Sequence, residues 1–132
     1  MPCRDAYDRA RSAFSVAHMS NAKWRKVLRA IATADLRLTR SEWKCIDSEH
    51  IMVHGIPRET DILEQRFADG QFLPTEYKWF EWVRFPRTYR PDSRSSYEVV
   101  QDIEGLRRVL ENCGRLCIQV NESGLSLYAY GR

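Results

Sequence analysis

The sequence predicts an α+β domain in which two main helices pack on a largely antiparallel sheet of about five to six strands. Two segments, about 21–34 and about 97–113, repeat apolar residues at helical spacing. Between and after them lie short runs of β-type residues separated by turn residues, which is typical of hairpins. Since helices and hairpins alternate along the chain, we expect the helices to cover the sheet. A further short helix is compatible with the N-terminus.

Length and composition fit one folded domain. The chain has 132 residues, of which 43% are hydrophobic and 30% charged, so it lacks the apolar depletion of disordered proteins. We expect residues 1–18 to form an N-terminal extension that can be helical, and residues 19–132 to form a single α+β domain. No apolar run reaches the roughly 18 residues that a membrane span needs, and no secretory signal is recognisable. Four scattered cysteines fit reduced thiols. These features predict a cytoplasmic protein without membrane contact.

The first main helix is predicted over about 21–34. Ser20 or Asn21 can cap its N-terminus. Its apolar stripe consists of Trp24, Val27, Leu28 and Ile31, and its basic residues, which lie largely on other sides, are Lys23, Arg25, Lys26 and Arg29. These basic side chains form either a solvated face or a phosphate-binding surface.

Three short segments follow this helix. Residues 42–46 and 50–54 predict two strands of a hairpin around the turn at 47–49. Residues 61–67 fit a strand or a short helix, and we favour the strand. The sheet would therefore begin directly after the first main helix.

An aromatic run at 76–86 predicts the best strand in the chain. It holds two of the four tryptophans, and Pro86 ends it. Alternation along a strand separates the side chains into two faces: Tyr77, Trp79, Glu81, Val83 and Phe85 on one, and Lys78, Phe80, Trp82 and Arg84 on the other. We expect a central position in the sheet. Glu81 then lies on an otherwise apolar face, where it is either paired with a cation or functional.

The second main helix and a terminal hairpin complete the prediction. Ser95 and Glu98 match a capping box, and Gly114 fits the end of a helix over about 97–113. Gly105 weakens that helix by roughly 1 kcal/mol relative to alanine, so its first turns can be separate. Residues 115–120 and 125–130 alternate around a turn at 121–124 and predict two paired strands.

Catalytic and cofactor motifs are absent from the sequence. His50 and His54 would stand about 13 Å apart on one strand, too far to share a metal ion. Cys45 with either histidine across the first hairpin could form a nucleophilic pair, but any hairpin that contains a cysteine and a histidine allows this pairing. The glycines are isolated, so no phosphate-binding loop is recognisable. We therefore predict no catalytic residues, no metal and no cofactor.

A loop rich in arginine follows the aromatic strand. Arg84, Arg87, Arg90 and Arg94 surround Tyr89, and Asp92 interrupts them. Basic and aromatic residues of this kind bind single-stranded nucleic acid, but they are also enriched in protein interfaces. The net charge of +3 is small for a nucleic-acid-binding protein.

Three segments carry a resemblance to known proteins: Ser20-Asn21-Ala22-Lys23-Trp24-Arg25-Lys26, Glu76-Tyr77-Lys78-Trp79-Phe80-Glu81-Trp82 and Leu127-Tyr128-Ala129-Tyr130-Gly131. They resemble small bacterial proteins grouped as a domain of unknown function, over about residues 19–132. The general layout is also similar to that of immunity proteins, which bind and neutralise a toxin in the cytoplasm. Neither resemblance implies catalytic residues.

Our leading prediction is a non-enzymatic protein-binding module, in one form an immunity-type protein whose partner is a toxin. The predicted partner-binding residues are Lys78, Phe80, Trp82, Arg84, Arg87, Tyr89 and Arg90. The alternative is a nucleic-acid-binding protein that uses Lys23, Arg25, Lys26, Arg29 and Arg94. A third hypothesis is an enzyme with a pocket at Glu81 or at His50 and His54. The oligomeric state stays open.

Overall fold

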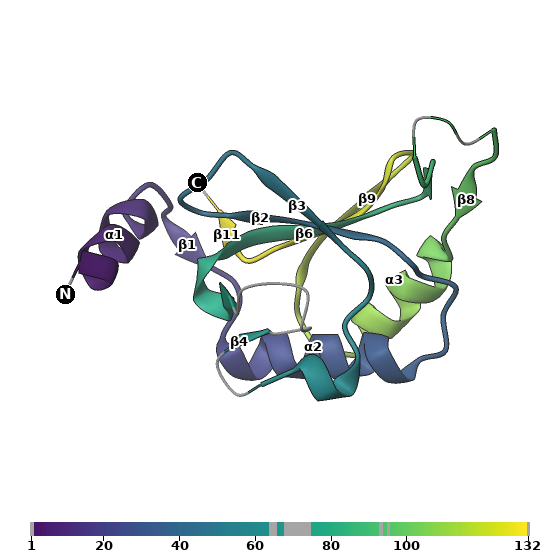
Figure 1. The fold of residues 1–132 in the computed structure, drawn as a ribbon. Coiled ribbons are helices and arrows are strands. Elements are labelled where there is room, and N and C mark those ends of the chain that lie inside the picture. Colours follow the sequence, from purple (N-terminus) through teal and green to yellow (C-terminus); the bar gives the residue numbers. More distant parts are fainter. Residues whose placement is uncertain (1, 64–65, 68–74, 93, 95, 132) are drawn as a thin grey trace.

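A five-stranded antiparallel sheet forms the centre of the molecule in the computed structural model, which describes residues 2–63, 66–67, 75–92, 94 and 96–131. Its strands run in the order β3 (Ile51–His54), β2 (Ser41–Cys45), β6 (Phe80–Pro86), β10 (Gly124–Tyr128) and β9 (Cys117–Asn121). Helices α2 (Asn21–Thr33) and α3 (Ile103–Glu111) both lie on one side of this sheet (Figure 1). The α+β class is confirmed, and β6, the aromatic strand, is central.

Helix α2 is anchored by its aromatic and aliphatic stripe. The Ser20 hydroxyl caps the helix by accepting a hydrogen bond from the Lys23 backbone N–H at 3.1 Å. Trp24 lies 5.8 Å from the ring of Trp43 and 5.8 Å from the ring of Phe80, measured between centroids. Because burying such side chains removes large apolar areas from water, this contact holds the helix against the sheet.

The aromatic run begins as a turn and continues as a strand. Tyr77–Trp79 is the 3-10 turn η2, so the strand begins at Phe80 rather than Glu76. Cys45 pairs with Phe80 and Lys44 pairs with Trp82, which leaves Glu81 as an extra, bulged residue. The prediction that Glu81 shares the face of Val83 and Phe85 is therefore wrong. The bulge shifts the alternation, so that Phe80, Val83 and Phe85 are all buried.

Helix α3 begins later than the sequence predicted. It covers Ile103–Glu111 instead of about 97–113, because Val99–Val100 forms strand β8, which pairs with β7 (Thr88–Tyr89). The cap is Asp102, whose carboxylate accepts a hydrogen bond from the Gly105 backbone N–H at 2.9 Å. A Cβ at position 105 would stand 2.3 Å from that carboxylate, so glycine makes room for the cap. Ser95, part of the predicted capping box, lies outside the described residues.

The two predicted hairpins are present, and the segment at 61–67 differs from the predicted strand in its described residues. Strands β2 and β3 pair, as do β9 and β10, whose turn is closed by the Asn121 side chain. In its described residues, the segment predicted as a strand at 61–67 contains the end of the 3-10 turn η1 (Glu59–Asp61) and the two-residue β4 (Arg66–Phe67), and residues 64–65 lie outside the described residues. Strand β4 pairs with β5 (Thr75–Glu76).

The N-terminal residues contact the rest of the chain. Helix α1 (Pro2–Arg11) lies beside one end of the sheet, and β1 (Val16–Ala17) pairs with β11 (Tyr130–Gly131) (Figure 1). The ring of Tyr7 packs edge-on against Trp79 at 5.4 Å between centroids, and Phe14 is buried. The end of the predicted extension is thus tied to the C-terminal strand by backbone pairing.

Candidate recognition surface

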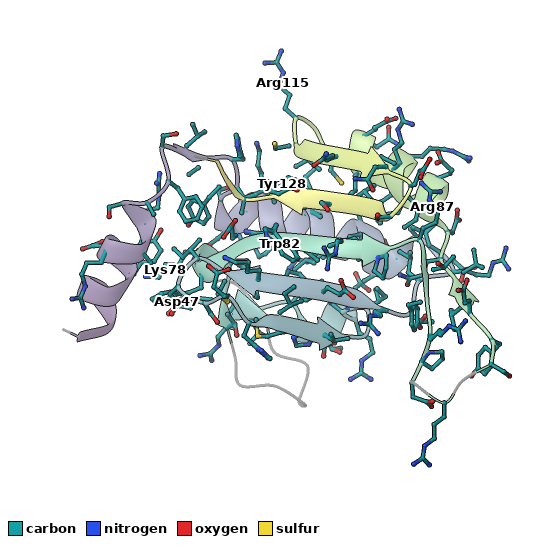
Figure 2. All side chains as sticks on the ribbon, turned by 90° about the horizontal axis from the view of Figure 1, so that it is seen from above. Asp47, Lys78, Trp82, Arg87, Arg115 and Tyr128 are labelled. Carbon is teal, nitrogen blue, oxygen red and sulfur yellow. The ribbon has the colours of Figure 1, made fainter. Side chains whose placement is uncertain are left out.

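One face of the central sheet is left without a covering helix among the described residues, and Figure 2 looks down on it. The strand register places two rows of side chains there, one running Ile51, Lys44, Trp82, Tyr128 and Cys117, the other Val53, Glu42, Arg84, Ser126 and Gln119. We call these ten residues the open face. Because neighbouring residues of a strand point to opposite sides, the residues between them form the face that packs on α2 and α3.

Aromatic and aliphatic side chains give the open face an apolar part. Trp82 and Tyr128 are direct cross-strand neighbours, and both are half-buried (Figure 2). At the β3 edge, Ile51 is 38% and Val53 48% exposed. Exposed large apolar residues that gather on one surface are typical of binding sites.

Two arginines on this side of the sheet share one carboxylate. Arg84 donates from Nε and Nη2 to Glu42 Oε1, at 2.9 and 2.7 Å. Arg40 donates from Nε to Glu42 Oε2 at 3.0 Å, and its Nη2 lies 2.9 Å from the same oxygen. Glu42 is only 8% exposed. Charge-assisted contacts from two arginines therefore hold this nearly buried carboxylate in place.

Each guanidinium of this group also lies against an aromatic ring. The Arg84 Cζ stands 5.1 Å from the Trp82 ring centroid, and the Arg40 Cζ stands 5.2 Å from the Tyr89 ring centroid. The Tyr89 hydroxyl in turn hydrogen-bonds to the Thr39 hydroxyl. We call the group of Arg40, Glu42, Arg84, Trp82 and Tyr89 the arginine cluster. It is built from strands β2, β6 and β7 and from Arg40, which directly precedes β2.

A buried glutamine fixes the backbone beneath the arginine cluster. The Gln101 Oε1 accepts hydrogen bonds from the backbone N–H groups of Thr39 at 2.7 Å and Arg40 at 2.9 Å. Its Nε2 donates to the carbonyls of Arg40 at 3.1 Å and Pro86 at 2.7 Å. Gln101 therefore joins the start of β2 to the end of β6, and all its amide groups are used.

Glu81 forms an ion pair with a lysine, which is one of the two roles that the sequence predicts for this residue. The Lys44 Nζ lies 2.5 Å from Glu81 Oε1 and 3.2 Å from the Cys45 carbonyl oxygen. Both side chains are largely buried. The bulge turns Glu81 toward Lys44 and away from the core, so the ion pair accounts for this carboxylate without a catalytic role.

The predicted partner-binding residues lie in several different parts of the structure. Trp82, Arg84 and Tyr89 belong to the arginine cluster. Phe80 does not reach the surface, because it is 1% exposed and packs 4.6 Å from the Trp43 ring between centroids. Lys78 and Arg87 lie at opposite ends of β6 (Figure 2), and Arg90 is exposed in the following loop. The inclusion of Phe80 in a recognition surface is thus wrong, because the bulge places it in the core.

The predicted nucleic-acid-binding residues are divided between helix α2 and the loop between β7 and β8. Lys23, Arg25, Lys26 and Arg29 belong to α2, on the covered side, whereas Arg94 is exposed in the loop between β7 and β8. The Lys23 ammonium is bonded to the carbonyls of His18 at 3.3 Å and Arg115 at 3.0 Å. The fold therefore does not join these cations with the open face into one basic surface.

Sequence reasoning missed Arg40, Glu42 and Gln101 as members of one site. They are distant from Arg84 or Pro86 along the chain, and only the pairing of β2 with β6 brings them together. Tyr128 was missed for the same reason. The alternation of β10 indicates that Tyr128 faces away from Leu125 and Leu127, but its neighbour Trp82 depends on the register.

Some hollows among the described residues can be compared with the sites of the enzyme hypothesis. Four of them have volumes of about 150, 340, 350 and 280 Å³, and neither Glu81, His50 nor His54 lines any of these four. Within the described part of the chain, no three His, Cys, Asp or Glu residues gather as metal ligands would. Burial, helped by the charge of Asp47, raises the pKa of Cys45 to about 11. Its thiol is then protonated near neutral pH, which argues against a nucleophilic pair with a histidine.

Comparison with known proteins gives no family. No family model, curated protein or solved structure matches the chain. The resemblance to an uncharacterised bacterial domain and to immunity proteins therefore stays a prediction. Among the described residues, no helix combines the length and the apolarity needed to cross a membrane.

Proposed function

We propose that this chain is a protein-binding module that recognises its partner with the open face. The observation that supports this most is the pair of half-buried rings, Trp82 and Tyr128, side by side on the side of the sheet opposite the helices. Tryptophan, tyrosine and arginine dominate the binding energy of protein interfaces, and the rigid rings of tryptophan and tyrosine bury large areas at a small cost in conformational freedom. Immunity-type neutralisation of a toxin is one form of this function.

The charges of the open face also fit a protein partner. Lys44 is neutralised by Glu81, and Glu42 lies between two arginines. Nucleic-acid binders instead present cations in excess, since each phosphate contact adds to affinity by releasing counterions. Here the two carboxylates offset two of the three cations Arg40, Lys44 and Arg84, so only one positive charge is left in excess. The distribution of charge therefore favours protein recognition over the nucleic-acid alternative.

The experiment compares the two half-buried rings of the open face with an exposed tyrosine elsewhere. The full chain is immobilised, partners are captured from the native host, and each captured protein is purified and titrated against Trp82→Ala, Tyr128→Ala and Tyr97→Ala. Tyr97 is a matched control, since it is 61% exposed and lies outside the open face. We expect the Trp82 and Tyr128 variants to bind at least about tenfold more weakly, equivalent to ~1.4 kcal/mol, and Tyr97→Ala to bind as the wild type does.

Other results would contradict the proposal. Equal weakening by all three variants, or by none, would exclude the open face as the binding site. Tight binding of single-stranded oligonucleotide that weakens steeply with salt would favour nucleic acid. If the captured protein is a toxin, co-expression with the wild type should restore growth, and co-expression with Trp82→Ala should not.

A further inference from the structure

We infer that the arginine cluster is a receptor for a carboxylate of the partner, so that the partner presents an acidic side chain beside apolar residues. This inference rests on the proposed function and names the chemistry that the open face would select. It starts from an imbalance of charge within the cluster, where Arg40 and Arg84 carry two positive charges and Glu42 carries one negative charge. One positive charge remains in excess.

The two guanidinium groups keep donors for a second acceptor. Their contacts with Glu42 use Nε and Nη2, which leaves the N–H groups of Nη1 outside this bonding. The side chain of Arg84 is 41% exposed and that of Arg40 27%, whereas that of Glu42 is 10% exposed. A ligand therefore meets the arginines first, and the carboxylate lies below them.

The cluster is preorganised before a ligand arrives. The Arg84 Cζ lies over the Trp82 ring and the Arg40 Cζ over the Tyr89 ring. Glu42 binds both guanidinium groups, and Gln101 fixes the backbone of Arg40. Long side chains normally lose rotamer freedom on binding, and this cost is smaller when the fold has already ordered them. A rigid planar donor also matches the two oxygens of a carboxylate.

The neighbours of the cluster indicate which acidic ligand fits. Val53 stands in the same row as Glu42 and Arg84, and Trp82 and Tyr128 stand in the next row. A protein segment that alternates acidic and apolar side chains would satisfy both. A nucleic acid fits less well, because one side of the Trp82 ring faces a guanidinium and the single surplus charge attracts a polyphosphate only weakly.

The test uses two blocked peptides that differ only in charge: acetyl-Glu-Leu-Glu-Leu-Glu-amide and its counterpart with glutamine at each glutamate. Each is titrated into the full chain while the side-chain N–H signals of arginine and tryptophan are followed by NMR. We expect the acidic peptide to shift the signals of Arg40, Arg84 and Trp82 and to bind at least about tenfold more tightly than its counterpart, equivalent to ~1.4 kcal/mol.

Two variants and a control separate charge from geometry. Arg84→Gln should remove the preference for the acidic peptide, and Arg84→Lys, which keeps the charge but loses the planar fork, should reduce it. Arg107→Gln is the control, because Arg107 is exposed on α3 and paired with Glu111 at 3.0 Å, away from the open face. Thermal melting of every variant checks that it is folded.

The outcomes distinguish this inference from the proposed function. Shifts at Trp82 that are equal for both peptides would overturn the carboxylate receptor and leave the open face as a binding site. Absence of any shift at millimolar peptide would overturn the receptor, and the partner titrations with Trp82→Ala then decide the proposed function by themselves. Stronger binding of oligothymidine than of the acidic peptide, with shifts at the same arginines, would assign the cluster to phosphate.

Discussion

Two neighbouring rows of side chains on the central sheet differ in their exposure to water and in their polarity, although each strand contributes one residue to both rows. The covered row runs through Met52, Trp43, Val83, Leu127 and Ile118, and the row of the open face one residue away runs through Ile51, Lys44, Trp82, Tyr128 and Cys117. In the covered row, the three central side chains are almost inaccessible to water. In the open row, the central side chains are half-buried and two of the five carry hydroxyl or ammonium groups. The covered row therefore belongs to the core that stabilises the fold, whereas the open row places polar and aromatic side chains at the surface.

The difference follows from what lies opposite each face. Helices α2 and α3 remove the covered row from water, so its stabilisation comes from apolar area. The open face has no helix over it in the described part of the chain, and its stabilisation comes from ion pairs and from rings that lie against guanidinium groups. The Arg84 side chain stays 41% exposed while it makes these contacts, unlike the central side chains of the covered row.

The largest expected effect is a difference in stability between variants of two tryptophans, one in the covered row and one in the open face. Trp43→Ala should lower the free energy of unfolding by about 3–5 kcal/mol, because it leaves a cavity beside Trp24 and Phe80. Trp82→Ala should lower it by only about 1 kcal/mol, since its ring is half-buried and its lost contact with Arg84 is partly solvated. Urea unfolding followed by circular dichroism measures both. Equal losses would mean that the open face is part of the folding core.

A smaller effect on the free energy of unfolding is expected at Glu42, the one open-face residue that is nearly buried. Glu42→Gln should lower the free energy of unfolding by about 1–2 kcal/mol, because it removes the charge that Arg40 and Arg84 share. Glu49→Gln is the matched control, since Glu49 is exposed. The same unfolding measurement applies. If both variants are as stable as the wild type, the arginine cluster is not held together by Glu42.

The smallest effect concerns the thiols. Cys117 is exposed at the end of a row of the open face, Cys113 is buried, and burial raises the pKa of both Cys113 and Cys45. At pH 8 iodoacetamide should therefore modify Cys117 before these two, as mass spectrometry of digested protein can show. Modification of Cys113 first would mean that the covered side opens more readily than the open face.

The raised pKa of Cys45 also has a consequence for stability. Its thiol ionises at about 11 in the folded protein and near 9 when unfolded, so the folded state holds its proton longer. Burial likewise raises the pKa of Tyr77 from 10 to about 12. Stability should be fully present below pH 9 and decrease as the pH rises through 9–12. Thermal melting across this range checks the direction, and Cys45→Ala should shift the start of the decrease upward.

Local signals were sufficient where neighbours in sequence are also neighbours in space. Helix α2 was predictable because its cap and its stripe lie within a few turns of each other, and the two hairpins were predictable because turn residues separate their strands. The start of α3 was not, since the Ser95-to-Glu98 pattern resembles a cap, while the residue that caps the helix is Asp102. Pairing of β8 with β7 decides against an earlier start.

The candidate site was only partly predictable. Trp82 and Arg84 followed from the aromatic strand, but alternation also selected Phe80, which the bulge at Glu81 places in the core. A bulge depends on how two strands fit together, and neither strand encodes it alone. Arg40, Glu42 and Gln101 join the site through contacts across more than forty positions of the chain, with separations such as 42 between Arg84 and Glu42 and 61 between Gln101 and Arg40.

The sequence by itself determined the α+β class, the first main helix, the two hairpins and the aromatic content of the central strand, because each depends on spacing within a short segment. Only the tertiary structure decided which face of that strand is covered, where its alternation shifts, and that two arginines share one carboxylate beside Trp82. These features depend on strand register and on where the helices pack, and both are set by contacts between distant parts of the chain.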